Sequence, residues 1–189
     1  MEITEDELKL RLDRINSWIN NCDQKASILL AVEGIVVTIL CTSDYISWIR
    51  QKLIFPIYYY YETRNGEFSL INAIQLCLLT VMLVLIVSSI FYSLQVIKGT
   101  TDPSLFKQSG LTEKSLLHFT SISSESFNNF KRATINQSNE SMLNDLLSQI
   151  YINSSICTTK FKYHKKSVYY FCWFLFLLVF ISVIQFVIK

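Results

Sequence analysis

Two groups of polar side chains have the spacing of residues that share one helix face. In the first group Asn16, Asn20 and Asp23 share a face and Lys25 follows them; in the second Asp145, Gln149 and Asn153 share a face and Lys160 lies further along the helix. If the two faces met, their carboxylates and amides could bind base edges or ribose hydroxyls, and Lys25 could bind a phosphate. The alternative is a pair of solvated faces with hydrogen bonds between helices. Spacing alone favours this alternative, because a polar stripe is the normal outer face of a helix.

Glu33 stands out because it is the one charged residue in the apolar run of residues 26–43. A carboxylate inside a membrane span is costly and rarely faces lipid. One interpretation is a residue that lines a pore or contacts a second subunit, with Gly34 beside it permitting close helix approach. The other is a residue that snorkels to the interface or hydrogen-bonds to a neighbour.

The sequence contains no Gly-rich phosphate loop, no spacing typical of metal ligands and no recognisable Ser/His/Asp set. We therefore expect no enzyme, no cofactor and no metal. An enzyme that uses Asp23 and Asp145 as acid and base is the weakest alternative, because no nucleophile accompanies them. A net charge of +2 argues against a nucleic-acid surface, and the five cysteines read as small hydrophobic residues in a reduced setting.

The chain has three apolar runs long enough to cross a bilayer, whose core takes roughly 20 helical residues. Hydrophobic residues make up 51% of the chain, and four glycines and two prolines leave long helices uninterrupted. We expect an all-α membrane protein with about three transmembrane helices, the first and last extended into a cytosolic helical bundle. The expected spans are residues 26–43, 68–97 and 167–188.

The segments between the spans set the expected orientation. Residues 1–25 are predicted to be a cytosolic amphipathic helix continuous with the first span, starting at a capping box of Thr4 and Glu7. Residues 44–67 are predicted to be an extracytoplasmic loop, and residues 98–166 a cytosolic helical region. Most Lys and Arg residues lie in the first and third of these segments, which places the N-terminus in the cytosol.

Two motifs resemble those of Pycsar transmembrane effector proteins. The motifs are Arg14-x-Asn16-x-x-Ile19-x-x-x-Asp23-x-Lys25-Ala26, which leads into the first span, and Asp145-x-x-x-Gln149-Ile150-Tyr151-x-Asn153, followed by Lys160, which leads into the last. The resemblance implies a bacterial inner-membrane antiphage effector. In that family a cyclase, a functional and not a physical partner, makes cUMP or cCMP during infection. The effector senses the nucleotide and disrupts the membrane, which leads to abortive infection.

The resemblance also makes the two polar groups the expected nucleotide-binding set, in a protein expected to form homo-oligomers. The family is usually described with fewer spans than the three expected here. The competing hypothesis is a membrane-anchored interaction subunit that binds a partner protein through its cytosolic helices, without a nucleotide ligand.

Overall fold

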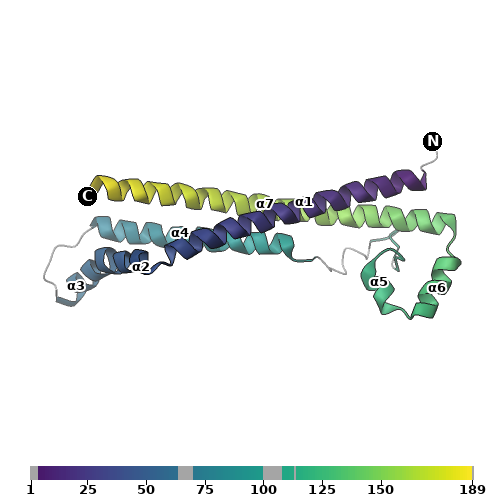
Figure 1. Ribbon diagram of the computed structural model, residues 1–189, viewed down its shortest axis with the longest axis horizontal. Helices are drawn as coiled ribbons and strands as arrows, with labels where there is room; N and C mark the ends of the chain where they lie inside the picture. The colour runs from purple at the N-terminus through teal and green to yellow at the C-terminus, as the bar shows by residue number, and fades with distance from the viewer. Residues whose placement is uncertain (1–3, 64–69, 100–107, 113, 189) are drawn as a thin grey trace. The chain divides into compact units, whose positions relative to one another are not determined.

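The structure, a computed structural model, describes residues 4–63, 70–99, 108–112 and 114–188. All regular structure within these residues is helical, as expected for an all-α membrane protein. The elements are α1 (Glu5–Leu40), α2 (Ser43–Ile49), η1 (Arg50–Ile54), α3 (Phe55–Thr63), α4 (Leu70–Ile97), α5 (Phe119–Ser124), α6 (Phe127–Ile135) and α7 (Asn139–Ile188), as drawn in Figure 1.

The two long helices follow from a chain with few helix breakers. α1 starts at the expected cap, where the Glu7 amide donates to the Thr4 hydroxyl at 3.4 Å. α7 continues for 50 residues without a glycine or proline. Its start is capped by Ser138, whose hydroxyl accepts from the Ser141 amide at 3.2 Å.

The prediction of a loop over residues 44–67 is wrong for the portion that the structure describes. Residues 43–63 are helical, with a π-helical turn at η1 between α2 and α3. Pro56 lies just beyond this turn, so its missing N–H falls where the α-helical bonding pattern is already interrupted. Residues 64–67 lie outside the described residues.

The chain divides into two compact units. The polar unit comprises residues 1–24 and 98–162, and the membrane unit comprises residues 25–97 and 163–189. α1 and α7 each contribute their residues to both units.

The membrane unit holds the apolar helices. α4 and α7 are each long and apolar enough to cross a membrane, and α1 qualifies only together with the helix that follows it at a bend of 55°. The structure therefore supports two spans, or three if the bent pair forms one. The hydrophobic core of the membrane unit contains Met82 and Ile86 from α4 and Phe171, Phe174 and Ile181 from α7.

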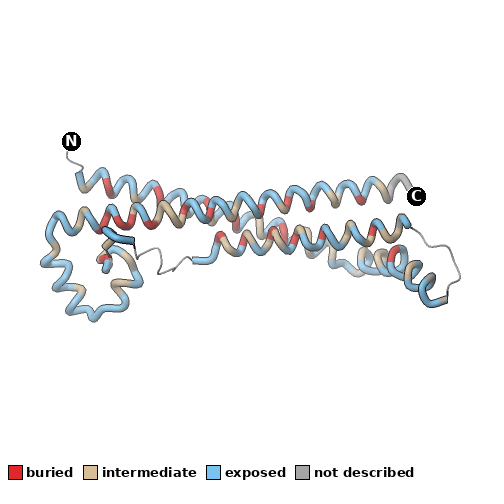
Figure 2. The backbone as a smooth tube through the Cα atoms, turned by 180° about the vertical axis from the view of Figure 1, so that it is seen from behind, coloured by how far each residue is buried: buried red, intermediate tan, exposed pale blue. Residues whose placement is uncertain are grey.

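Figure 2 shows buried residues as red bands along the helices, and on α4 they recur at alternating steps of four and three. On α4 they are Met82, Ile86, Ser89, Ser93 and Val96. This is the spacing of helices that pack side by side as in a coiled coil. Two serines thus occupy positions where an apolar residue is the usual choice.

Other hydroxyls of the membrane unit are bonded within their own helix. Thr80 donates to the Leu76 carbonyl at 3.0 Å, and Ser88 donates to the Val84 carbonyl at 2.7 Å. Both hydroxyls lie on exposed positions of α4. A hydroxyl satisfied in this way can face lipid without leaving an unpaired donor.

Candidate functional site

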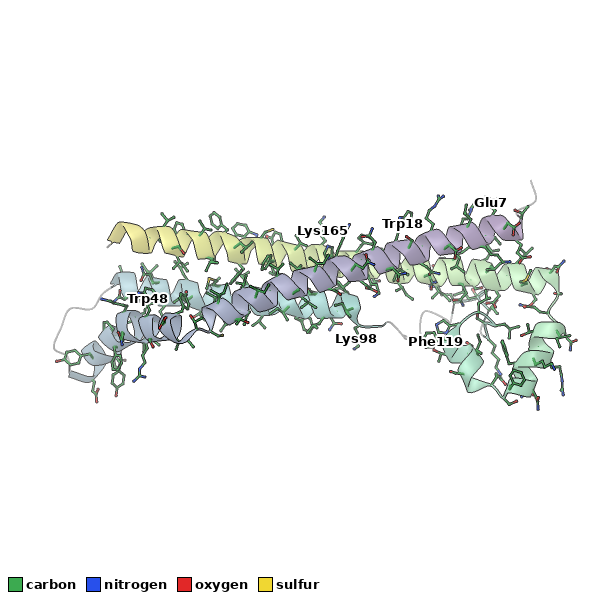
Figure 3. The ribbon with its side chains drawn as sticks, in the orientation of Figure 1. Glu7, Trp18, Trp48, Lys98, Phe119 and Lys165 are labelled. Carbon is green, nitrogen blue, oxygen red and sulfur yellow. The ribbon has the colours of Figure 1, made fainter. Side chains whose placement is uncertain are left out.

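The polar unit contains a seam between the N-terminal portions of α1 and α7. α1 buries Leu8, Ile15 and Cys22, which are seven residues apart, and α7 buries Leu146 and Ile152. Burying these apolar side chains removes them from water, which stabilises the packing of the two helices in this unit. Trp18, which Figure 3 labels, lies instead on an outer face of α1 and is 52% exposed.

Two polar pairs cross this seam, and all four residues belong to the groups predicted from the sequence. Asn153 Nδ2 donates to Asn16 Oδ1 at 2.9 Å, and Lys160 Nζ donates to Asp23 Oδ1 at 2.6 Å. The Lys160 side chain is only 7% exposed and that of Asp23 is 34% exposed. The two predicted groups therefore do meet, and they meet by bonding to each other.

Asp145 and Gln149 belong to a region of α7 that contacts a different neighbour, the stretch that contains Thr112 and Leu116. Asp145 Oδ2 accepts from the Leu116 amide at 2.9 Å, and one turn later Ser148 Oγ accepts from the Thr112 amide at 3.0 Å. Asp145 and Gln149 are buried, and the Asp145 Oδ1 and Gln149 Nε2 atoms have no hydrogen-bond partner among the described residues. This region of α7 therefore anchors a loop and retains unused polar capacity.

The remaining two members of the predicted set stand apart from these contacts. Asn20 is exposed on α1, beside the exposed Ser17 and Gln24. Lys25 is exposed as well and belongs to the membrane unit, where its charge adds to burial in lowering the pKa of His164. Neither contributes to the two pairs of the seam.

Glu33 anchors a separate polar cluster inside the membrane unit. Its side chain is fully buried, and its Oε1 accepts a hydrogen bond from the Ser89 hydroxyl of α4. Ser89 and Ser93 each lie within hydrogen-bond distance of the Ser167 hydroxyl of α7, at 3.1 Å and 2.6 Å. Three helices thus meet through one carboxyl group and three hydroxyls.

This geometry matches the second interpretation of Glu33, a hydrogen bond to a neighbour. The role of Glu33 and Gly34 in a pore or a subunit contact stays a prediction, because a single chain does not test it. Gly34 is exposed, and a Cβ atom placed on it would meet nothing within 4 Å. A larger side chain would therefore fit at position 34 of α1, next to the buried carboxyl group of Glu33.

Sequence reasoning missed the serines that make these contacts. Ser167 lies seven residues after Lys160, and Glu33 lies seven after the buried Ala26. A search for seven-residue spacing along the whole of α1 and α7 would have placed both on the inward stripes. Ser89 and Ser93 had no such signal, because α4 has no charged residue and apolar side chains on all its faces, so periodicity does not identify its inward face.

A cavity of about 790 Å³ lies elsewhere in the polar unit, among α5, α6, the segment 114–116 and the start of α7. Its walls include Lys114, Leu116, Ile122, Phe130, Arg132 and Asn136. None of the eight residues predicted to bind a nucleotide lines it. Within the described residues, no group of three or more His, Cys, Asp or Glu side chains could hold a metal ion.

Comparison with known proteins decides the family. The Pycsar effector protein domain matches residues 7–188. The chain belongs to the Pycsar effector family. It is also 34% identical over 159 residues to the Pycsar effector protein GmPycTM of Gulbenkiania mobilis, a match that covers 83% of this chain and 80% of that relative. No solved structure matches the chain.

Membership of the Pycsar effector family confirms the resemblance drawn from the two motifs. It connects the chain with antiphage defence by a cyclic-nucleotide signal and with a membrane setting. Both motifs contribute residues to the seam. Asp23 of the first motif and Lys160, which follows the second, are the residues that the structure joins.

Proposed function

We propose that this protein is a membrane effector of a bacterial antiphage system, which senses a cyclic pyrimidine mononucleotide and then disrupts the inner membrane. The signal is cUMP or cCMP, and the outcome is abortive infection. The observation that carries the proposal is the family match over residues 7–188, which takes in both the polar and the membrane portions of α1 and α7.

The nucleotide acts as a signal and not as a substrate. A ligand shifts a conformational equilibrium only by the difference between its affinities for the two states. Moving a population from 1:99 to 99:1 takes about 5.5 kcal/mol of such difference. A homo-oligomer in which several subunits share one opening would collect this free energy from several binding events, so we propose an oligomeric effector without enzymatic activity.

The eight residues predicted from the sequence form the responsive region of the polar unit in this proposal. The contacts Asn16–Asn153 and Asp23–Lys160 hold α1 against α7 without ligand. Nucleotide binding changes the helix packing that these pairs stabilise. A nucleotide cyclase produces the signal and need not touch the effector, and no nucleic acid is involved.

The main test uses the full chain reconstituted in vesicles that contain a self-quenching dye. Addition of cUMP or cCMP should release the dye, whereas linear UMP and protein-free vesicles should give none. Purine cyclic nucleotides provide the specificity control. If the reconstituted protein binds no cyclic nucleotide and the vesicles stay sealed, it is not a nucleotide-gated effector, and the interaction-subunit hypothesis takes its place.

We further propose a multi-pass protein of the inner membrane with a cytosolic N-terminus, based on the Lys and Arg distribution. Single cysteines at Glu62 and at Ser123, introduced after the native cysteines are replaced, test this orientation. An impermeant maleimide added to intact spheroplasts should label the cysteine at position 62 and spare the one at 123. The opposite pattern would invert the topology.

A further inference from the structure

We propose that the cyclic nucleotide binds in the cavity between α5 and α6, and not in the seam between α1 and α7. The inference rests on the proposed function, since it names the seat of the same signal. Figure 1 shows α5 and α6 as two short helices joined by a turn, with the far end of α6 leading into the start of α7. The cavity of about 790 Å³ falls within the roughly 300–1,000 Å³ of typical small-molecule sites.

The lining of the cavity offers the three kinds of contact that a cyclic mononucleotide needs. Arg132 provides a guanidinium for the phosphate, and Phe130 provides an aromatic face on which a base can stack. Asn136 provides an amide that both donates and accepts, as the hydrogen-bonding edge of a pyrimidine requires, and Asn129, whose side chain also bonds to Glu125, lines the same cavity. These residues come from α6 and the turn that follows it.

The charge balance of the cavity suits a singly charged ligand. Lys114 Nζ lies 3.1 Å from Glu125 Oε1, so these two lining charges neutralise each other. The same contact keeps the pKa of Glu125 below its ordinary value. Arg132 then remains as the lining cation without a carboxylate partner among the described residues. One net positive charge matches the single negative charge of a cyclic phosphate diester.

The seam is a poorer binding site for the nucleotide, because its polar side chains are already hydrogen-bonded to each other. Asn16 is bonded to Asn153, and Asp23 to the nearly buried Lys160. A ligand there would first have to break both pairs and separate the two helices. The cavity needs no such step, since most of its lining residues are at least partly exposed.

The cavity is nevertheless connected to α7 by its own wall. Leu116 lines the cavity, and its amide donates to Asp145 Oδ2 at 2.9 Å. The same segment is held at a second point, because the Thr112 amide donates to Ser148 of α7. A ligand that moves residues 114–116 therefore acts directly on the buried Asp145. Asp145 thus holds Leu116 in the wall of the cavity and does not itself touch the nucleotide.

The test is calorimetry of the full-length protein in detergent with cUMP and cCMP as probes. Arg132→Ala and Phe130→Ala should each weaken binding by about tenfold or more. Lys131→Ala, at an adjacent exposed residue that does not line the cavity, is the matched control and should bind like the wild type. Asp23→Asn should retain binding while losing vesicle leakage. Far-UV circular dichroism confirms that each variant is folded.

The outcomes separate this inference from the proposed function. If the wild type binds a probe, and Arg132→Ala and Phe130→Ala bind it equally well, the cavity is not the seat. Loss of binding in Asp23→Asn alone would place the nucleotide at the seam. If the wild type binds neither probe, the proposed function fails and this assignment fails with it.

Discussion

Lys160 contacts Asp23 at 2.6 Å, and seven residues earlier on both helices Asn153 contacts Asn16 at 2.9 Å. Both pairs span the same 137 residues of chain. α1 and α7 therefore run parallel along the seam, with one fixed register. A shift of either helix by a single residue would break both contacts at once.

Replacing Asp23 by Ala should leave the buried Lys160 ammonium without its carboxylate. We expect a loss of stability of about 1–3 kcal/mol, less than for a fully buried pair because Asp23 is partly exposed. Nucleotide-triggered leakage should be lost while membrane insertion persists. Thermal unfolding in detergent and dye release measure the two effects.

The matched control is the double exchange Asp23→Lys with Lys160→Asp, which restores an ion pair with reversed polarity. It should recover most of the stability lost in the single variant. A variant Asp23→Ala that inserts normally and still leaks with nucleotide would show that the pair has no role in signalling.

Asp145→Ala should release the segment that ends at Leu116. The side chain is 1% exposed and accepts from the Leu116 amide, so its removal leaves a donor unpaired. We expect a faster hydrogen exchange of the Leu116 amide and loss of nucleotide-triggered leakage. Asn144→Ala, at the exposed preceding position, is the control. Unchanged exchange at Leu116 would refute the anchoring role.

Glu33→Leu should destabilise the packing of α1, α4 and α7, because it removes the contact of α1 to Ser89, whose hydroxyl then has only its partners on α7, and places a branched apolar side chain against buried hydroxyls. Glu33→Gln preserves an acceptor of the same size and should be nearly silent. Vesicle leakage without nucleotide reports on the closed state, and we expect it to rise in Glu33→Leu. If Glu33→Gln instead changes the ion selectivity of the triggered leak, the carboxylate lines the open pathway.

Gly34 tests the predicted subunit contact. Because a Cβ atom at this position meets nothing in the single chain, Gly34→Ala should not disturb the fold and should favour the helix by up to about 1 kcal/mol. Gly34→Leu should lower the oligomeric fraction in native mass spectrometry if helices of two subunits approach here. Val32→Leu, at another exposed position of α1, is the control. An oligomer unaffected by Gly34→Leu would move the contact to another face.

His164 predicts a pH dependence of stability. Burial lowers the pKa of His164, and the nearby Lys25 lowers it further. The folded protein therefore favours the neutral imidazole, while the unfolded chain takes up a proton near about pH 6.5. The free energy of unfolding is therefore unaffected by His164 above about pH 7.5, and it falls as the pH drops through about 6.5. Thermal unfolding between about pH 5.5 and 8 should show this slope, and His164→Gln should flatten it.

Composition and hydropathy were sufficient to predict the class of fold, because long apolar runs without helix breakers leave few alternatives. The start of α1 followed from the capping box at Thr4. The last long helix followed from an apolar run without glycine or proline that ends near Ile188. The pairing of Asn16 with Asn153 did not, since periodicity identifies a face but not its partner. Spacing left two interpretations open, a ligand pocket between the two faces or hydrogen bonds between the helices, and the structure shows hydrogen bonds of the second kind for Asn16–Asn153 and Asp23–Lys160.

The helical conformation of residues 43–63 and the cavity beside α6 were harder to predict. The first depends on a π-helical turn that accommodates Pro56, and no short motif encodes such a turn. The second depends on two short helices and on the preceding segment, which Lys114 joins to the end of α5 through Glu125. A polar, serine-rich stretch carries too little hydrophobic pattern to reveal a concave surface.

The bond between Glu33 and Ser89 joins residues 56 positions apart, which has a consequence for synthesis. When α1 leaves the ribosome, its carboxyl group enters the membrane before the serine that will donate to it has been made. A lone acidic residue near the centre of a span costs about 2.5–3.5 kcal/mol during translocon insertion. We therefore expect the first span to stay at the translocon until α4 has been synthesised, and the two helices to enter the lipid bilayer together.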